Sequence, residues 1–179
     1  HKLLPGSVLS IDREHQGIIP SPKAYWSALD GVLQGQANPF AGSETEATTQ
    51  LETLLREAIR SRMVADVPLG AFLSGGIDSS IVVALMQAQT TLPVKTFTIG
   101  FDELEHNEAA HAKAVARQIG TDHTELYVTA AKAADVIPKL PTLYDEPFSD
   151  SSQIPTLLVS ELARQHVTVC LSGDGGDEV

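Results

Sequence analysis

The chain has 179 residues, of which 42% are hydrophobic and 20% are charged, and its formal net charge is −11. This length is sufficient for one α/β domain with a sizeable core, and the composition is not that of a disordered chain. The acidic charge argues against a nucleic-acid-binding surface, no apolar run approaches the roughly 20 residues of a membrane span, and no signal peptide is recognisable at the start.

Residues 1–42 differ from the rest of the chain because prolines and glycines interrupt them throughout. We interpret this segment as a connector, in which a short strand at Val8–Ile11 pairs with Ile18–Ile19. A helix is expected to begin at Ser43, because Glu46 three residues later completes a capping box. An apolar face is predicted along this helix by residues that recur with a period near 3.6, namely Leu51, Leu54, Leu55, Ala58, Ile59 and Met63.

Beyond this helix, predicted strands and helices alternate. Apolar, β-branched runs predict strands at 68–73, 94–99, 123–128 and 167–171. Helices are predicted at 78–89, 107–119, 130–137 and 152–165, with Gly120 ending the second of them. The alternation predicts an α/β fold, a parallel sheet with helices on both faces, whose ligands bind at the carboxyl ends of the strands. Cys170 lies in the last strand, where we expect a buried thiol without chemistry, and a lone cysteine fits a reducing, cytoplasmic compartment.

Two glycine-rich turns follow the first and the last of these strands, at 74–80 and 172–178. Neither turn has the lysine of a Walker-type loop or the glycine spacing of a dinucleotide-binding loop, so both of those classes are disfavoured. A turn that joins a strand to a helix exposes backbone N–H groups at the positive end of the helix dipole. The first turn therefore indicates a phosphate-binding site.

Carboxylates inside both turns indicate a bridging metal ion. Asp78 lies in the first turn, and Asp174, Asp177 and Glu178 lie in the second. These carboxylates would repel a polyphosphate unless a cation bridged them, and Mg²⁺ commonly takes one or two carboxylates together with phosphate oxygens. The sequence thus predicts Asp78 and one acid of the second turn as Mg²⁺ ligands. The alternatives are a helix N-cap for Asp78 and a solvated or Ca²⁺-binding loop for the second turn.

The first turn resembles the pyrophosphate loop, S-G-G-x-D-S, of N-type ATP pyrophosphatases. Taken in order, residues 66–80, 97–101, 145–152 and 171–178 resemble the synthetase domain of glutamine-dependent asparagine synthetases. The resemblance spans residues 43 to 178 and implies an adenine nucleotide alpha hydrolase-like (PP-loop) fold. It divides the chain into the tail of a glutaminase domain with its linker, 1–42, and a truncated N-terminal part of the ATP-binding synthetase domain, 43–179.

The same resemblance implies roles for the motif residues. The phosphates that leave as pyrophosphate would be held by the first turn, at Ser74, Gly75, Gly76, Ser79 and Ser80. Mg²⁺ would be ligated by Asp78 and Asp177. The adenosine would be bound by Leu73, Ile99 and Gly100, with Ser172 and Gly173 against the AMP portion. Catalytic roles would fall to Asp174, Asp177 and Glu178, and Asp174 stands where many family members have a longer glutamate.

The activity that the resemblance implies is ATP-dependent asparagine synthesis, a carbon–nitrogen ligase reaction. The β-carboxylate of aspartate would become β-aspartyl-AMP with release of pyrophosphate, and ammonia from a glutaminase domain would then displace AMP. The implied partners are these small molecules, with no nucleic acid and no membrane, and a second copy in a homodimer of the full-length enzyme. Because the family's glutaminase nucleophile and the residues that follow position 179 in the family are absent, we expect a fragment that makes no asparagine alone.

Three alternatives remain open on the sequence. A related adenylating ligase, such as those that close β-lactam rings, would keep the activation step and change the acceptor. A tRNA-modifying ATP pyrophosphatase is disfavoured by the acidic charge and by the absence of a C-x-x-C pair. A remnant that binds nucleotide without catalysis is disfavoured by the retention of Asp78 and Asp177.

Overall fold

The computed structural model describes residues 2–11, 13, 17, 19–101, 108–146 and 149–176. The chain divides into two compact units, residues 1–50 and 51–179, and the boundary falls inside the helix α2 (Glu44–Arg62). Within the described residues, none of the helices has both the length and the apolar composition needed to cross a bilayer.

A two-stranded antiparallel ribbon opens the first unit. The strand β1 (Ser7–Val8) pairs with β2 (Lys23–Ala24), and the carbonyl of Gly6 accepts a hydrogen bond of 2.8 Å from the N–H of Tyr25. The predicted pairing with residues 18–19 is therefore wrong, although Ile18 itself lies outside the described residues. The turn at Gly6 selects the later partner because its carbonyl and its close contact with Trp26 bring residues 24–26 alongside.

The first unit also contains a helix that the sequence did not predict, α1 (Ala28–Ala37). Its N-cap is Ser27, whose hydroxyl accepts a hydrogen bond of 3.3 Å from the N–H of Asp30. Gly31 and Gly35 lie within α1, and glycine has a low helix propensity, so the local pattern indicated a connector instead.

The capping box predicted for α2 is confirmed. The N–H of Ser43 donates to the Glu46 carboxylate at 2.7 Å, and the N–H of Glu46 donates to the Ser43 hydroxyl at 3.3 Å. The predicted apolar face is covered only in its C-terminal half, because Ile59 is buried in the core of the second unit while Leu51 and Leu54 remain more than half exposed.

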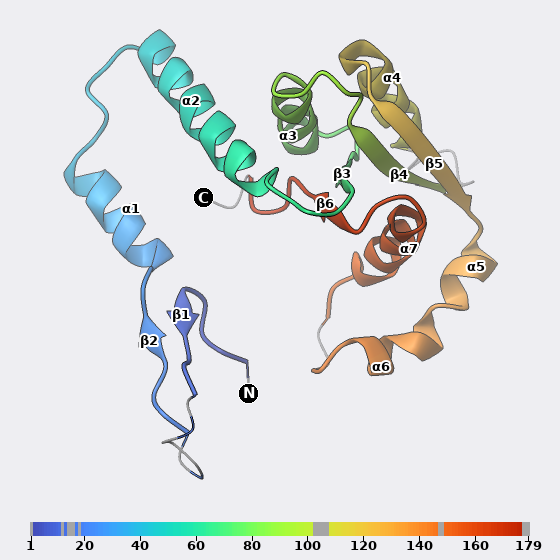
Figure 1. Cartoon of the computed structure of the whole chain (residues 1–179), viewed down its shortest axis with the longest axis horizontal. Helices are drawn as coiled ribbons and strands as arrows, with labels where there is room; N and C mark the ends of the chain where they lie inside the picture. Colours follow the sequence, from blue (N-terminus) through green and yellow to red (C-terminus); the bar gives the residue numbers. More distant parts are fainter. Residues whose placement is uncertain are drawn as a thin grey trace. The chain divides into compact units, whose positions relative to one another are not determined.

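The second unit is built on a four-stranded parallel sheet with the order β5-β4-β3-β6 (Figure 1). Its strands in chain order are β3 (Leu69–Phe72), β4 (Lys95–Phe101), β5 (Asp122–Val128) and β6 (Val169–Leu171). The prediction of a parallel sheet is confirmed. Because β6 comes last in the chain yet lies beside β3, the carboxyl ends of these two strands are neighbours, and the turns that follow them meet.

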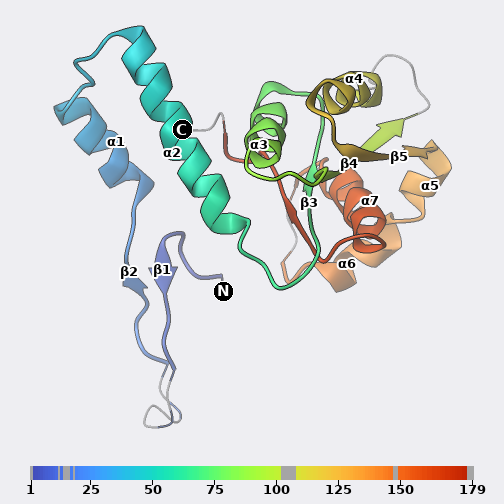
Figure 2. The ribbon, with the colours of Figure 1, turned by 45° about the horizontal axis from the view of Figure 1, so that its top comes forward.

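Helices cover both faces of this sheet, as predicted (Figure 2). Three of these helices are α3 (Ile77–Gln87), α4 (Ala109–Ile119) and α7 (Gln153–Arg164). The alternation of side chains along β3 accounts for the two layers: Ala71 and Leu73 pack in the core that contains α3 and α4, whereas Phe72 packs against the cluster that contains α7.

Short elements connect β5 to α7. They are α5 (Ala130–Ala134), the 3-10 helix η3 (Ile137–Lys139) and α6 (Leu140–Leu143). The sequence predicted a longer first helix and then a loop. Pro138 and Pro141 lie at the first turns of η3 and α6, where a missing N–H is tolerated, so this segment remains helical.

The lone cysteine lies in β6, as predicted, but it is only partly buried there and not fully buried as we expected. Burial raises the pKa of the Cys170 thiol to about 11, because the thiolate would lose its hydration there. A thiol that stays protonated at neutral pH is a weak nucleophile, which agrees with a packing role.

Candidate functional site

The two glycine-rich turns meet at the carboxyl edge of the sheet. Ala71 of β3 is in register with Leu171 of β6, so each turn begins within three residues of a paired position. Gly173 in the second turn lies directly against the start of α3: a β-carbon there would be 2.6 Å from the nitrogen of Ser79 and 2.9 Å from the carbonyl carbon of Asp78. Only glycine allows this approach, because both contacts are to backbone atoms.

The carboxylate of Asp78 lies at this junction. A β-carbon on Gly176 would be 2.9 Å from Cγ and 3.1 Å from Oδ1 of Asp78, so the second turn contacts the carboxylate itself. The N-cap of α3 is Gly76, and Asp78 is the second helical residue, so the alternative reading of Asp78 as the N-cap is wrong. Two predicted residues of the second turn, Asp177 and Glu178, lie outside the described residues.

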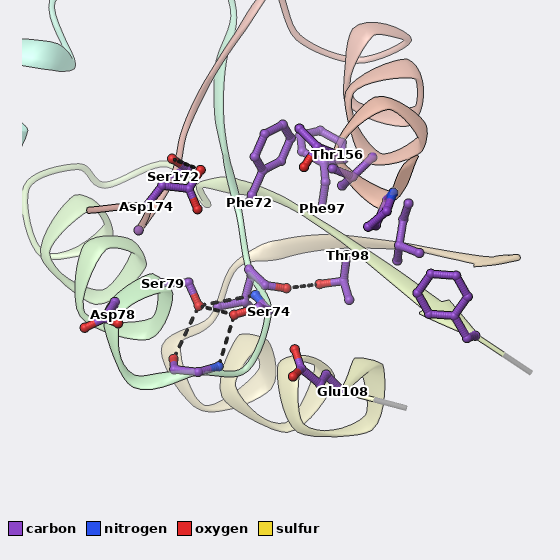
Figure 3. Close-up of a pocket in the computed structure, with 17 residues that line it drawn as sticks. Phe72, Ser74, Asp78, Ser79, Phe97, Thr98, Glu108, Thr156, Ser172 and Asp174 are labelled. Carbon is purple, nitrogen blue, oxygen red and sulfur yellow. Dashed lines mark hydrogen bonds between the residues drawn. The ribbon is translucent and has the colours of Figure 1, made fainter. Parts of the chain in front are cut away.

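Hydroxyl groups hold the shape of the first turn (Figure 3). The hydroxyls of Ser74 and Ser79 are 2.9 Å apart, and the Ser74 hydroxyl also accepts from the N–H of Gly76 at 3.2 Å. The hydroxyl of Ser80 donates to the Gly76 carbonyl at 2.6 Å. These hydrogen bonds fix the conformation of the turn.

Backbone N–H groups at the start of α3 are the natural anion donors of this turn. The N–H of Ser80 makes the first bond of the helix, to the Gly76 carbonyl at 3.1 Å, so the N–H groups of residues 77–79 precede the intrahelical ladder. Gly75, with φ of +83°, turns the loop against α4, where a β-carbon would be 2.8 Å from the nitrogen of Ala112. The fold therefore presents a helix N-terminus toward the edge where the turns meet.

A pocket of about 550 Å³ opens at this edge (Figure 3). The structure brings together nine of the residues predicted from the sequence in its lining: Leu73, Ser74, Gly76, Asp78, Ser79, Ile99, Ser172, Gly173 and Asp174. Three other predicted residues, Gly75, Ser80 and Gly100, lie outside the lining. Gly100 instead faces β5 and α4, where a β-carbon would be 2.7 Å from the ring of Tyr127.

Part of the pocket lining was missed by the sequence reasoning. These residues are Phe72, Phe97, Thr98, Phe101, Glu108, Pro155, Thr156 and Val159. Those on β4 lie in the segment 97–101 that carries the family resemblance, and this resemblance was the available signal for them. The residues of α7 had no local signal, because this helix reaches the pocket only through the packing of Val159 and Leu162 with Phe97.

The donor set suits a magnesium ion that arrives with a nucleotide. Asp78 and Asp174 line the same pocket, and the Asp174 carboxylate accepts a hydrogen bond of 3.1 Å from the Ser172 hydroxyl. No group of three metal-ligating side chains occurs among the residues described. A dedicated all-protein cage is not required, since Mg²⁺ bound to phosphates needs only one or two protein carboxylates. Asp78, in contact with both turns, fits that role.

Comparisons with known proteins agree on one family. A family model described as asparagine synthase matches residues 50–179. The chain is 50% identical over 127 residues to a putative glutamine-hydrolyzing asparagine synthetase of Methanocaldococcus jannaschii, covering 70% of this chain and 24% of that protein. It is 33% identical over 141 residues to asparagine synthetase 1 of Bacillus subtilis, covering 79% and 22%.

Among solved structures, the NMN synthetase of Francisella tularensis is similar at 17% identity and a TM-score of 0.44, covering 70% of this chain and 52% of that one. The chain spans about a quarter of the length of the curated relatives it matches. With the family match over residues 50–179 and the identity to the archaeal relative, the chain belongs to the asparagine synthase family.

Proposed function

We propose that this chain forms the nucleotide-binding part of an ATP-dependent asparagine synthetase that activates aspartate as β-aspartyl-AMP. The observation that carries the proposal is the contact between the two turns, where Gly173 lies against the start of α3 and Gly176 against the Asp78 carboxylate. A polyphosphate at this edge would meet backbone N–H groups from one turn and a carboxylate held by both.

In this mechanism the first turn binds the β- and γ-phosphates through the N–H groups of residues 77–79, with Ser74 and Ser79 fixing the turn. Leu73 and Ile99 line the side of the pocket for the adenosine, and Ser172 and Gly173 line the side for the AMP phosphate. The Asp78 and Asp177 carboxylates would hold Mg²⁺, which supplies positive charge against the departing pyrophosphate.

The reaction is a substitution at the α-phosphorus. An oxygen of the aspartate β-carboxylate bonds to this phosphorus while the bond to the bridging oxygen of pyrophosphate breaks. The donors of the first turn stabilise the charge that develops on the leaving group. Ammonia then attacks the β-carbonyl carbon and AMP leaves, and a glutaminase domain of the whole protein would supply that ammonia. Asp174, Asp177 and Glu178 in the second turn are proposed to act beside the acyl group.

Binding rather than turnover is the direct test, since the chain spans about a quarter of its relatives' length. We expect calorimetry to show that the chain binds ATP with Mg²⁺, and that Asp78→Asn weakens this binding at least about tenfold, because a charged ligand group is lost. The matched control is Asp135→Asn, the same charge change at the C-cap of α5 and outside the pocket lining, which should bind as the wild type does.

Equal affinities of the wild type and Asp78→Asn for Mg²⁺-ATP, with unchanged circular dichroism, would contradict the proposed role of the turn junction. Binding by the Asp78→Asn variant that no longer depends on Mg²⁺ would support it, because the metal would have lost its protein ligand.

A further inference from the structure

Glu108 brings to the pocket a carboxylate that the proposed function does not use. It lines the pocket together with Leu73, Ser74 and Thr98. Figure 3 shows its carboxylate directed toward the side of the pocket where Ser74 and Thr98 lie. Because a carboxylate and a phosphate repel each other, this group must face solvent or a part of the ligand other than the phosphates.

The start of α4, to which Glu108 belongs, is fixed by packing on two sides. Ala109 is fully buried, and a β-carbon on Gly100 of β4 would be 3.0 Å from the β-carbon of Ala109. A β-carbon on Gly75 in the first turn would be 2.8 Å from the nitrogen of Ala112, and the N–H of Ala112 donates to the Glu108 carbonyl at 3.0 Å. The backbone of Glu108 is therefore held between the end of β4 and the first turn.

The Glu108 side chain has no structural partner in the part of the chain that is described. Glu108 is the N-cap of α4, but its side chain makes no capping hydrogen bond. It takes part in none of the ion pairs among the described residues, and Lys113 on the same helix is paired with Glu125 at 2.7 Å instead. Glu108 is also exposed, so its carboxylate is accessible to a ligand in the pocket.

The place of Glu108 selects the part of the nucleotide that it would meet. Ser74 begins the turn proposed to bind the phosphates, and Thr98 precedes Ile99 on the side of the pocket proposed for the adenosine. A group directed toward both residues faces the part that joins the phosphates to the base, which is the ribose. An ionised carboxylate only accepts hydrogen bonds, and its two oxygens match the two neighbouring hydroxyls of a ribose. Acidic residues bind ribose hydroxyls in this way in dinucleotide-binding folds.

We infer that Glu108 is a specificity-determining residue whose carboxylate accepts hydrogen bonds from the 2′- and 3′-hydroxyls of the ribose, so that the site favours ribonucleotides. The inference rests on the proposed function, in which this pocket binds Mg²⁺-ATP. The competing interpretations are a second metal ion held by Glu108 and a carboxylate that stays in solvent. Ligands that differ only in the sugar separate these three roles.

The experiment measures by calorimetry the binding of ATP, of 2′,3′-dideoxy-ATP, which lacks both hydroxyls, and of tripolyphosphate, which lacks the nucleoside, each with Mg²⁺. We expect the wild type to bind ATP at least about fivefold more tightly than dideoxy-ATP, the effect of hydrogen bonds to a charged acceptor. In Glu108→Ala this ratio should fall toward one. The affinity of that variant for tripolyphosphate should be unchanged or slightly higher, because a negative charge is removed.

Two further variants serve as controls. Glu108→Gln keeps the length and one acceptor oxygen but loses the charge, so its ratio should lie between those of the wild type and Glu108→Ala. Glu57→Ala removes the same charge from α2, outside the pocket lining, and should bind all three ligands as the wild type does. Circular dichroism should be unchanged in each variant, since Glu57 and Glu108 are both exposed.

A ratio of ATP to dideoxy-ATP affinity that Glu108→Ala leaves unchanged would overturn the inference. If tripolyphosphate binding were weakened as well, the result would indicate a metal ion held by Glu108. If no ligand were weakened, it would indicate a solvated carboxylate. In both cases the wild type still binds Mg²⁺-ATP and the proposed function stands, whereas a wild-type chain that binds none of the three ligands would contradict the proposed function and, with it, this inference.

Discussion

The absence of a side chain at Gly176 leaves space for the Asp78 carboxylate. A β-carbon at position 176 would be 2.9 Å from Cγ of Asp78, closer than such atoms approach in proteins, and the neighbouring atoms belong to a side chain that can rotate. We therefore expect Gly176→Ala to fold normally while forcing Asp78 out of its present rotamer. A displaced rotamer costs about 0.5–1.5 kcal/mol, so Mg²⁺-ATP should bind about two- to tenfold more weakly by calorimetry.

The control for this change is Gly31→Ala in α1, where a β-carbon meets nothing within 4 Å. That variant should bind Mg²⁺-ATP with wild-type affinity. If Gly176→Ala also bound with wild-type affinity, the Asp78 carboxylate would not be a metal ligand in the bound state, or its present position would not matter for binding.

The end of α4 shows how one glycine terminates an element. Gly120 adopts φ of +85°, and its N–H donates to the carbonyl of Ala116 at 2.9 Å, as the sequence predicted for a C-terminal cap. Space is not the constraint, because a β-carbon would meet nothing within 4 Å. We expect Gly120→Ala to lower the free energy of unfolding by about 1 kcal/mol through backbone strain alone, and Gly120→Asn to lower it less.

Urea unfolding followed by circular dichroism measures this difference. Nucleotide binding should not change in either variant, since Gly120 lies outside the pocket lining. An alanine variant as stable as the asparagine variant would show that α4 ends by another conformation in solution.

At the level of elements, the sequence was informative wherever the determining contacts are local. The capping box of Ser43 and Glu46 and the cap at Gly120 depend on neighbours within a few residues, and the strands of the sheet have apolar, β-branched local patterns; all were predicted. The partner of β1 was missed because β1 pairs with residues 23–24, which are distant in the sequence. The helix α1 was missed because it contains two glycines, a residue type that local patterns assign to connectors.

The candidate site was also predicted only where its residues follow a local pattern. Its two turns were predicted from the glycines and hydroxyl residues beside the strand ends. The part of the lining contributed by α7 was not predicted, because it depends on how Phe97 packs against Val159 on the other face of the sheet.

At the scale of the whole molecule, an acidic chain is proposed to bind an acidic ligand. The net charge of −11 repels a nucleotide at long range, so attraction must come from groups at short range. The N-terminus of α3 supplies oriented N–H groups, and a cation bound with the nucleotide would reduce the repulsion from Asp78. This argues that Mg²⁺-ATP, rather than free ATP, is the species that binds.

The stability of the folded molecule should depend on pH through His123 on β5. Its Nδ1 lies 2.9 Å from the Thr96 hydroxyl, and its Nε2 is buried with no hydrogen-bond partner among the described residues. Burial lowers the pKa of His123 below its ordinary value of 6.5, with Lys113 acting in the same direction and Glu125 against it. Burial is the larger effect because it removes water from the ring.

The pKa of His123 is lower in the folded chain than in the unfolded chain. Below a pH of about 6.5, His123 therefore binds a proton in the unfolded chain while it stays neutral in the folded chain. The free energy of unfolding should therefore decrease as the pH falls from about 6.5 toward the folded-state pKa, by at most about 1.4 kcal/mol per pH unit for one proton. His123→Gln keeps a polar side chain and removes this titration. Urea unfolding at a series of pH values should show a shallower decline for the variant in this window.

The carboxylates of Asp122 and Glu125 titrate at lower pH than the window in which wild type and His123→Gln are compared. Hydrogen bonds from Lys95 and Lys113, respectively, lower the pKa values of these two groups, so their contribution to stability is present at neutral pH and is lost at more acidic pH than the histidine window. Wild type and His123→Gln should thus differ mainly between the acidic end and pH 6.5, with a smaller difference at the acidic end because His123 also lowers the pKa of Glu125. Identical curves across the whole range would show that the pKa of His123 is not lowered in the folded chain.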